Sequence, residues 1–190
     1  MALYSDALTG SGGLGANWTV TSPANWQRTA SGARQEEAGG AYRKAVYSGG
    51  AMDSDNYRVQ ATIAYDSDAS IGHGVAGRWA SGGTITCYGL IRFAAEVYFV
   101  EITAGAETQA VLLGAFGTGP LELRQEYDGS TIRSYVAGVL EDERSDASLA
   151  SGSPGLIAYG GGPSATNYAT NWTAEDLATV RRVMMLLGVG

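Results

Sequence analysis

The stretch Asn56-Tyr57-Arg58-Val59-Gln60-Ala61-Thr62-Ile63-Ala64-Tyr65 decides the fold class of this chain. Its odd-numbered positions are apolar or aromatic, and its even-numbered positions are mostly polar. Successive side chains of a β-strand point to opposite faces of a sheet, so this period of two predicts an antiparallel strand with one buried face.

Outward from this stretch, segments with the same alternation recur at short intervals, and glycine-containing turns separate them. Asp128-Gly129 is one such turn, because this pair tolerates the positive φ of a tight hairpin. Many short strands without an intervening helix are typical of an all-β fold, and we expect a two-sheet antiparallel jelly-roll sandwich. The other candidate strands are 26–29, 42–47, 71–80, 84–93, 96–103, 108–113, 121–127, 131–137, 139–143, 155–159 and 167–172.

The end of the chain changes to a helical spacing. Thr173 precedes Asp176 by three residues, as at a helix start with an acidic third residue. We expect an amphipathic helix over 174–187, with a strand through 183–189 as the alternative. The predicted organisation is a flexible lead-in over 1–13, one jelly-roll domain over 14–172 and a short C-terminal helix within 173–190. The apolar residues at helical spacing are Leu177, Val180, Met184 and Leu187.

Composition excludes several classes of protein. The 190 residues carry a formal net charge of −7, with 45% hydrophobic and 16% charged residues, which suits one soluble folded domain rather than a disordered chain. The acidic balance argues against nucleic-acid binding through phosphate contacts. A single cysteine excludes an intramolecular disulfide, and no apolar run reaches the roughly 20 residues of a membrane-spanning helix. Because no secretion signal follows Met1, we expect a protein that is not exported.

A series of short motifs runs in a fixed order over roughly residues 14–172. They are Leu14-Gly15-Ala16-Asn17-Trp18-Thr19-Val20 followed by Trp26, Asp55-Asn56-Tyr57-Arg58-Val59-Gln60-Ala61, Gly77-Arg78-Trp79, Tyr88-Gly89-Leu90-Ile91-Arg92-Phe93, Leu121-Glu122-Leu123-Arg124, Tyr135-Val136-Ala137-Gly138 and Ser151-Gly152-Ser153-Pro154-Gly155-Leu156. This ordered series resembles the concanavalin A-like lectin/glucanase jelly roll, in its laminin-G-like and carbohydrate-binding forms. The resemblance implies two sheets with one concave face, where such domains usually bind glycans or proteins. It also implies a similarity to free-standing domains of bacterial and phage proteins.

The hydrolytic motif of the resembled glucanases is missing. Those enzymes hold Glu-x-Asp-x-x-Glu on one strand, whereas the nearest string here, Glu126-Tyr127-Asp128, lacks the last Glu and crosses a predicted turn. Glu96 and Glu101 lie five apart on one predicted strand and therefore face opposite sides. We expect a protein that is not an enzyme, with a glycoside hydrolase of the same fold as the alternative.

Reactive and metal-binding side chains are few. His73 and Cys87 are the only histidine and cysteine, and neither lies in a nucleophile motif, so we expect ordinary strand or core positions for both. Asp66 and Asp68 form a candidate site for a calcium ion, with a solvated turn as the alternative. An EF-hand loop that began at Asp66 would need glycine where Ile71 stands. Apart from this calcium option, we expect no cofactor.

The candidate ligand-binding residues are arginines and tyrosines on predicted strands. Tyr88 and Arg92 share one strand face, opposite the apolar Cys87 and Ile91. If these faces join on a concave sheet, the arginines offer planar donors for sugar hydroxyls and the tyrosines offer ring faces for C–H surfaces. The alternative is that they are partly exposed sheet residues. The predicted groove is lined by Arg78, Tyr88, Arg92, Arg133 and Tyr135.

These expectations combine into a non-catalytic binding or structural module. From the resemblance and the missing signal we expect a virion location in a bacteriophage, after synthesis in the host cytoplasm, with capsid decoration or glycan adhesion as the role. The expected partners are other virion or assembly proteins, a second copy of the chain and a glycan, but neither nucleic acid nor a membrane. A purely structural oligomer subunit is a further alternative, in which Leu177, Val180, Met184 and Leu187 form an assembly contact rather than pack on their own domain.

Overall fold

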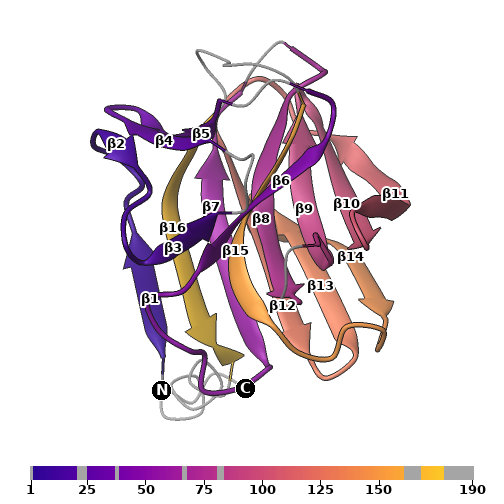
Figure 1. Ribbon diagram of the computed structural model, residues 1–190. Helices are drawn as coiled ribbons and strands as arrows, with labels where there is room; N and C mark the ends of the chain where they lie inside the picture. Colours follow the sequence, from indigo (N-terminus) through magenta and orange to yellow (C-terminus); the bar gives the residue numbers. More distant parts are fainter. Residues whose placement is uncertain are drawn as a thin grey trace, which may run out of the picture.

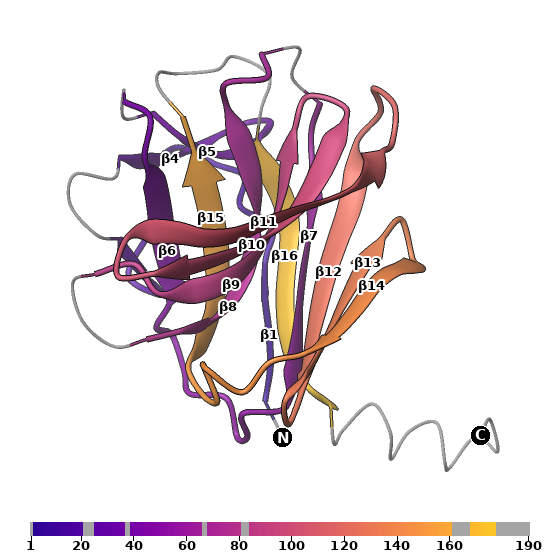
Figure 2. The same cartoon turned by 90° about the vertical axis from the view of Figure 1, so that its right-hand side faces the viewer.

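The structure, a computed structural model, describes residues 2–20, 25–36, 39–65, 68–80, 84–160 and 168–177. Its strands form two sheets of antiparallel strands that stack face to face as a sandwich (Figure 1, Figure 2). This arrangement confirms the predicted all-β jelly roll. None of the residues that the structure describes belongs to an apolar helix of membrane-spanning length.

The nine-stranded sheet contains the stretch that decided the fold class. The odd-numbered side chains of β7 (Tyr57–Ile63) are buried and the even-numbered ones are half-buried, as the alternation predicts. The strand order is β14 (Val139–Ser145), β13 (Thr131–Val136), β12 (Leu121–Asp128), β7, β16 (Ala169–Asp176), β5 (Gly32–Gln35), β4 (Trp26–Thr29) and β2 (Gly12–Gly13), and β1 (Leu3–Asp6) also pairs with β16.

The seven-stranded sheet forms the other layer. Its strand order is β11 (Ala106–Ala115), β10 (Glu96–Thr103), β9 (Cys87–Phe93), β8 (Gly72–Trp79), β15 (Ser153–Tyr159), β6 (Tyr42–Tyr47) and β3 (Trp18–Val20). The predicted Asp128-Gly129 hairpin joins two strands of the nine-stranded sheet, with Asp128 opposite Thr131 and Gly129 at a φ of +58°. A positive φ at this position is what a tight hairpin turn requires of its glycine.

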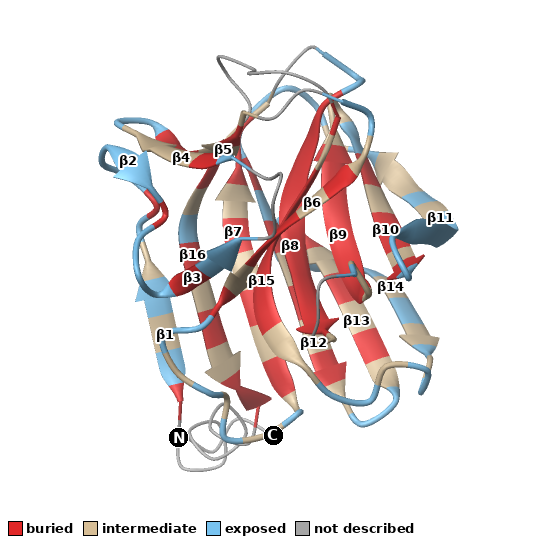
Figure 3. Ribbon diagram, viewed as in Figure 1, coloured by how far each residue is buried: buried red, intermediate tan, exposed pale blue. Residues whose placement is uncertain are grey.

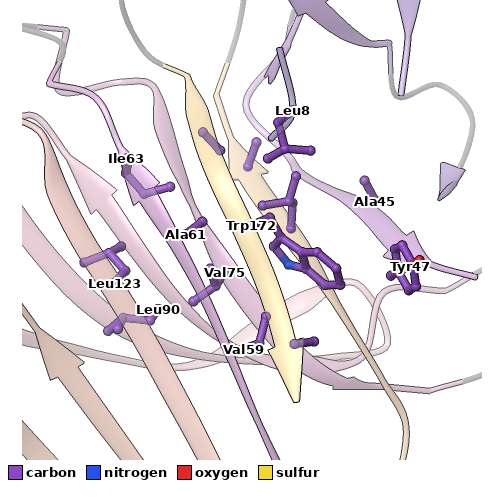
Figure 4. Packing of buried hydrophobic residues seen from close by; sticks show 14 of the residues in the cluster. Leu8, Ala45, Tyr47, Val59, Ala61, Ile63, Val75, Leu90, Leu123 and Trp172 are labelled. Atoms are coloured by element: carbon purple, nitrogen blue, oxygen red, sulfur yellow. The ribbon is translucent and has the colours of Figure 1, made fainter. Parts of the chain in front are cut away.

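An apolar and aromatic core fills the space between the sheets (Figure 4). The Trp172 side chain on β16 is fully buried, and its ring centroid lies 4.8 Å from that of Tyr47 on β6 and 4.9 Å from that of Trp18 on β3. Because β16 belongs to one sheet and the other two strands to its partner, this cluster ties the layers together. Truncation of a buried tryptophan to alanine typically costs about 3–5 kcal/mol.

The N-terminal residues belong to the sandwich, which corrects the prediction of a flexible lead-in over 1–13. β1 pairs with β16 from Leu3 to Asp6, and Leu8 is fully buried. The Asp6 carboxylate accepts hydrogen bonds from Trp18 Nε1 at 2.9 Å and from the Arg28 guanidinium at 2.5 Å. The alternation in β1 covers only four residues, so its strand character comes from pairing with a distant strand rather than from local pattern.

The start of the predicted C-terminal helix is also corrected. β16 continues through Thr173 to Asp176, where the helix was expected to begin, and Thr173 pairs with both Ser5 and Gln60. The Asp176 carboxylate accepts hydrogen bonds from the backbone N–H groups of Ala2 and Ser54. The sheet ladder therefore extends through the residues where the helix was expected to begin. Leu177 is the last described residue here, so Val180, Met184 and Leu187 lie outside the described residues.

Two central strands of the seven-stranded sheet are buried on both faces (Figure 3). All eight residues of β8 are buried, although only one face of the strand meets the other sheet. A second apolar cluster covers the outer face and includes Ala76, Trp79, Cys87 and Ile91. The outer face of this sheet is therefore a covered surface, and the candidate functional site lies there.

Candidate functional site

The five residues of the predicted groove do not come together, and this corrects the sequence-based site. Arg92 is buried and directed into the sandwich, where its guanidinium group donates to backbone carbonyls. Nη1 donates to Gly119 at 2.7 Å and to Ile63 at 3.1 Å, Nη2 to Gly117 at 2.7 Å, and Nε to Ala94 at 2.8 Å. Arg92 therefore anchors the loop that contains Gly117 and Gly119 to the core, and its guanidinium group is not directed toward a ligand.

Arg78 and Tyr88 have the same structural role at the opposite end of the sheet. The Arg78 guanidinium donates to the carbonyls of Leu149, at 2.9 Å, and of Gly129, and it lies over the Tyr127 ring at 5.2 Å. Arg78 has a φ of +52°, and this irregularity turns its side chain inward. The buried Tyr88 phenol oxygen accepts from the Leu149 N–H at 3.2 Å.

Arg133 and Tyr135 lie on the other sheet, on its outward face. The Nε atom of Arg133 donates to Glu143 at 2.6 Å, and the Tyr135 phenol donates to Glu126 at 3.2 Å. The alternation on β9 identified the residues that share a face, but it could not tell which face is inside, because both faces of β9 are buried. Cys87 and Ile91 turn out to lie on the outer face, and Tyr88 and Arg92 on the inner face.

The outer face of the seven-stranded sheet is concave. The Tyr42 phenol on β6 donates a hydrogen bond to the Glu107 carboxylate on β11, although these are the sixth and first strands of the sheet. Figure 2 shows the β10–β11 hairpin reaching across the sheet toward β6. This contact and its neighbours cover the central side chains, so Cys87, Ile91 and Ile157 are fully buried beneath them.

A row of aromatic rings crosses one end of the concave face, and we call Tyr42, Tyr159, Phe93 and Tyr98 the aromatic arc. Ring centroids lie 4.8 Å apart for Tyr42 and Tyr159, 5.7 Å for Tyr159 and Phe93, and 5.9 Å for Phe93 and Tyr98. The register explains the row, because Phe93 pairs with Gly72, Gly72 with Tyr159, and Tyr159 with Tyr42. A Cβ atom on Gly72 would lie 2.7 Å from the Phe93 ring, so this glycine provides the space for that ring.

Carboxylates stand at both ends of the aromatic arc. Glu107 accepts from the Tyr42 phenol, and Glu96 accepts from the Tyr98 phenol at 2.6 Å. Burial first and the Glu107 hydrogen bond second raise the pKa of Tyr42, whereas the Glu96 hydrogen bond is the main reason that the pKa of Tyr98 is raised. Both phenols therefore stay protonated at neutral pH and act as donors.

Two cavities lie on the concave face. The first, which we call the aromatic cavity, has a volume of about 540 Å³ and is lined by Tyr42, Phe93, Tyr98, Tyr159, Glu96 and Glu107 among others. The second, which we call the lysine cavity, has a volume of about 630 Å³ and is lined by Lys44, Trp79 and the hydroxyl residues Thr19, Ser148, Ser151 and Ser153 among others. A cavity of several hundred Å³ is large enough for a small organic ligand.

The residues of the two cavities are not among those that the sequence predicts for the site, although the sequence does contain a signal for them. Tyr42, Lys44 and Val46 alternate along one predicted strand and therefore share a face. The alternation alone could not assign a role to that face, because the pattern does not show that the sheet curls over its own outer surface. The aromatic residues at the ends of three strands, Tyr42, Phe93 and Tyr159, are the feature that could have indicated the arc.

The remaining candidates have structural roles. His73 accepts a hydrogen bond from the Gln35 N–H at 3.1 Å, and the Cys87 thiol is buried, which raises its pKa. Both therefore occupy ordinary interior positions, as predicted. Asp68 accepts hydrogen bonds from Ser70, as in a turn, and Asp66 lies outside the described residues. Across the described ranges no group of three or more His, Cys, Asp or Glu side chains is placed to hold a metal ion.

Comparisons with known proteins identify the fold. No family model matches the chain, and no curated protein matches it in sequence. The solved structures that it resembles include the carbohydrate-binding module CBM66 from Bacillus subtilis, with a TM-score of 0.66 and 18% identity over 84% of this chain and 96% of that one. A β-glucanase from Bacillus licheniformis aligns with a TM-score of 0.61 and 12% identity over 93% of this chain and 98% of that one.

A Crh5 transglycosylase in complex with NAG gives a TM-score of 0.65 with 9% identity, over 93% of this chain and 85% of that one. These similarities confirm that the chain has the concanavalin A-like jelly-roll fold. At such low identities they establish the fold and leave function to be argued from the site.

Proposed function

We propose that the concave face of the seven-stranded sheet binds a glycan, with the aromatic cavity as its main contact, and that the protein does not hydrolyse this ligand. The aromatic arc is the observation that carries the proposal. Aromatic ring faces pack on the C–H surfaces of sugar rings, and carboxylates accept hydrogen bonds from sugar hydroxyls. The arc offers four rings in sequence with Glu96 and Glu107 at its two ends.

The similar structures agree with this proposal. One is a carbohydrate-binding module, one is a β-glucanase and one is a transglycosylase in complex with NAG. In this chain the same fold carries a cavity whose polar groups are mainly tyrosine phenols and carboxylates. The chemistry of the cavity and the structures that share this fold therefore both support a carbohydrate ligand.

The spacing of the carboxylates supports binding without hydrolysis. Glu107 pairs with Ile102, which is six residues from Glu96 along β10, so their Cα atoms are separated by about 20 Å along the strand direction. A retaining glycosidase needs two carboxyl groups about 5 Å apart, and an inverting one needs about 6.5–9.5 Å. Glu96 and Glu101 lie on opposite faces, because Glu101 falls between Val100 and Ile102, which both belong to the outer-face cluster.

The experiment is a glycan array of neutral and acidic oligosaccharides, followed by isothermal titration of each hit. We expect binding by the intact chain and a loss of affinity of about tenfold or more for Tyr159→Ala, which removes one of the two inner rings of the arc. The matched control is Tyr135→Ala on the other sheet, which leaves affinity unchanged. Absence of any bound glycan, or equal losses in both variants, would overturn the proposal.

Hydrolysis of a bound glycan is the outcome that would favour the alternative function, that of a glycoside hydrolase. A reducing-sugar assay on every bound glycan, with Glu96→Gln and Glu101→Gln as variants, separates the two functions. Hydrolysis by the intact chain that disappears in one of these variants would show that the protein is a glycoside hydrolase. The place in a bacteriophage particle stays a prediction from the sequence.

A further inference from the structure

We propose that the aromatic cavity binds positively charged amino groups, so that the glycan on the concave face is an oligosaccharide of amino sugars such as glucosamine. This inference rests on the proposed function, since it names the class of glycan that the same cavity takes. The charge of the cavity wall is the first observation. Glu96 and Glu107 both line the cavity, and the described residues around it include no Lys, Arg or His.

The carboxylates of Glu96 and Glu107 are accessible to a ligand. Both residues are exposed, and each carboxylate accepts a hydrogen bond from one tyrosine phenol of the aromatic arc. Neither residue forms an ion pair with another residue that the structure describes. A carboxylate has about four lone-pair sites, so one phenol leaves most of them to accept hydrogen bonds from an ammonium group.

A similar carboxylate on the other sheet carries a counter-charge from the chain itself. Glu126 accepts from the Tyr135 phenol at 3.2 Å, and its Oε1 atom also lies 3.5 Å from the Nε atom of Arg124. No described residue that lines the aromatic cavity supplies such a cation to Glu96 or Glu107. A cationic ligand would supply it, and the formal net charge of −7 adds a long-range attraction for that ligand.

The aromatic arc adds a second attraction for a cation. Its successive ring planes are inclined to one another at 59° for Tyr42 and Tyr159, 66° for Tyr159 and Phe93, and 84° for Phe93 and Tyr98. The arc is therefore not one flat platform, and its rings border the cavity in several orientations. An ammonium group within about 6 Å of the centre of a Tyr or Phe ring is attracted to the ring face, while other rings still contact the C–H surfaces of the sugar.

The distance between the two carboxylates favours an oligosaccharide over a single amino sugar. The Cα atoms of Glu96 and Glu107 are separated by about 20 Å along the strand direction, so one amino group cannot reach both side chains. The aromatic arc runs from Tyr42, which donates to Glu107, to Tyr98, which donates to Glu96. A chain of amino sugars that lies along the arc therefore presents different amino groups to the two carboxylates.

The test compares two β-1,4-linked tetrasaccharides, the tetramer of glucosamine and cellotetraose, which has a hydroxyl group in place of each amino group. Isothermal titration is carried out at about pH 5.5, where carboxylates are ionised and the amino groups of the ligand are protonated. We expect the glucosamine tetramer to bind the intact chain about tenfold more tightly than cellotetraose. An increase of NaCl from about 50 mM to about 500 mM should reduce this preference, because salt screens charge pairs at an exposed site.

Three variants locate the preference in the molecule. Glu96→Gln and Glu107→Gln each remove one charge from the cavity and keep an oxygen that can accept from the neighbouring phenol. Each should reduce the preference for the glucosamine tetramer about threefold or more and leave the affinity for cellotetraose within about twofold. Glu126→Gln is the matched control, because it removes the same charge from beside a tyrosine phenol on the other sheet, and it should retain the full preference.

Equal affinity of the two tetramers for the intact chain would overturn the inference while leaving glycan binding in place. A preference that all three variants reduce equally, or that all three leave unchanged, would also overturn it, because the preference would then come from the charge of the whole protein rather than from the cavity. If neither tetramer binds but another glycan does, the inference again fails and the proposed function stands. If no glycan binds at all, both fail.

Discussion

The Tyr42 phenol donates a hydrogen bond to the Glu107 carboxylate and joins two strands that stand five places apart in the seven-stranded sheet. Beneath this contact lie side chains that an open sheet would expose to solvent, Cys87 among them. The bridge thus helps to turn an outer sheet face into a second apolar cluster. It also forms one wall of the aromatic cavity.

Loss of this bridge should loosen the concave face. Tyr42→Phe removes the donor and keeps the ring, and we expect the free energy of unfolding to fall by about 1 kcal/mol. Opening of the cover should raise the rate of Cys87 labelling by a thiol reagent under native conditions about fivefold. The measurement is labelling followed by mass spectrometry, together with urea unfolding.

Tyr135→Phe is the matched control, because Tyr135 also donates from its phenol to a carboxylate, that of Glu126, but on the other sheet. It should leave Cys87 labelling unchanged. Equal labelling rates in the two variants would contradict a covering role for the Tyr42–Glu107 contact.

The aromatic arc should require the space that Gly72 leaves for the Phe93 ring. Gly72→Ala places a methyl group 2.7 Å from the present position of the Phe93 ring, so the ring must move away from Tyr159. We expect a stability loss of about 1–3 kcal/mol, as in other overpacked sites, and a loss of glycan affinity of about tenfold. Thermal unfolding and titration with an array-identified glycan measure the two effects.

Gly119→Ala provides the control for this substitution. A Cβ atom there would meet nothing within 4 Å, and the Gly119 carbonyl can still accept from Arg92. Both stability and affinity should be unchanged. An unaltered affinity in Gly72→Ala would show that the position of Phe93 does not matter for binding.

Arg92 should matter for stability and not for ligand binding. Arg92→Lys keeps the positive charge but cannot reach the carbonyls of Ala94, Gly117 and Gly119 together. We expect the free energy of unfolding to fall by about 2–4 kcal/mol, because buried carbonyls lose charged donors. Glycan affinity at a temperature where the variant is folded should stay within about twofold of the original.

Arg133→Lys serves as the comparison, since Arg133 forms partly exposed ion pairs with Glu143 and Asp128. Exposed pairs contribute about 0–1 kcal/mol, so this change should be nearly neutral. A large loss of affinity in Arg92→Lys with unchanged stability would instead support the groove that the sequence predicts.

The period of two in residues 56–65 was sufficient to predict the fold class, because burial of one strand face places apolar residues at alternate positions of the sequence. The site was not predictable in the same way. On β9 the Tyr88 and Cys87 faces are both buried, one by the other sheet and one by the Tyr42–Glu107 bridge, so alternation no longer distinguishes inside from outside. Pairings distant in sequence, such as Leu3 with Glu175, carry no local signal either.

Buried tyrosines should make the fold sensitive to alkali. Burial raises the pKa of Tyr57 and of Tyr127 above the usual value of 10. At a pH between 10 and these raised pKa values, the folded state therefore binds more protons than the unfolded state. Their contribution to stability is therefore fully present below about pH 10 and is lost as pH rises further, by about 1.4 kcal/mol per pH unit for each tyrosine. Urea unfolding from about pH 8 to about pH 11, with tyrosinate absorbance recorded in parallel, measures this dependence.

Tyr57→Phe tests the assignment. The Tyr57 phenol oxygen accepts from the Arg78 N–H at 2.5 Å, so the variant should be less stable at pH 7, by about 1–3 kcal/mol, because a buried donor loses its acceptor. Above pH 10 its stability should fall less steeply than that of the original chain, since one buried phenol no longer titrates. An unchanged slope in Tyr57→Phe, or tyrosinate absorbance that develops completely before the unfolding transition, would contradict the inference that these buried phenols resist ionisation in the folded state.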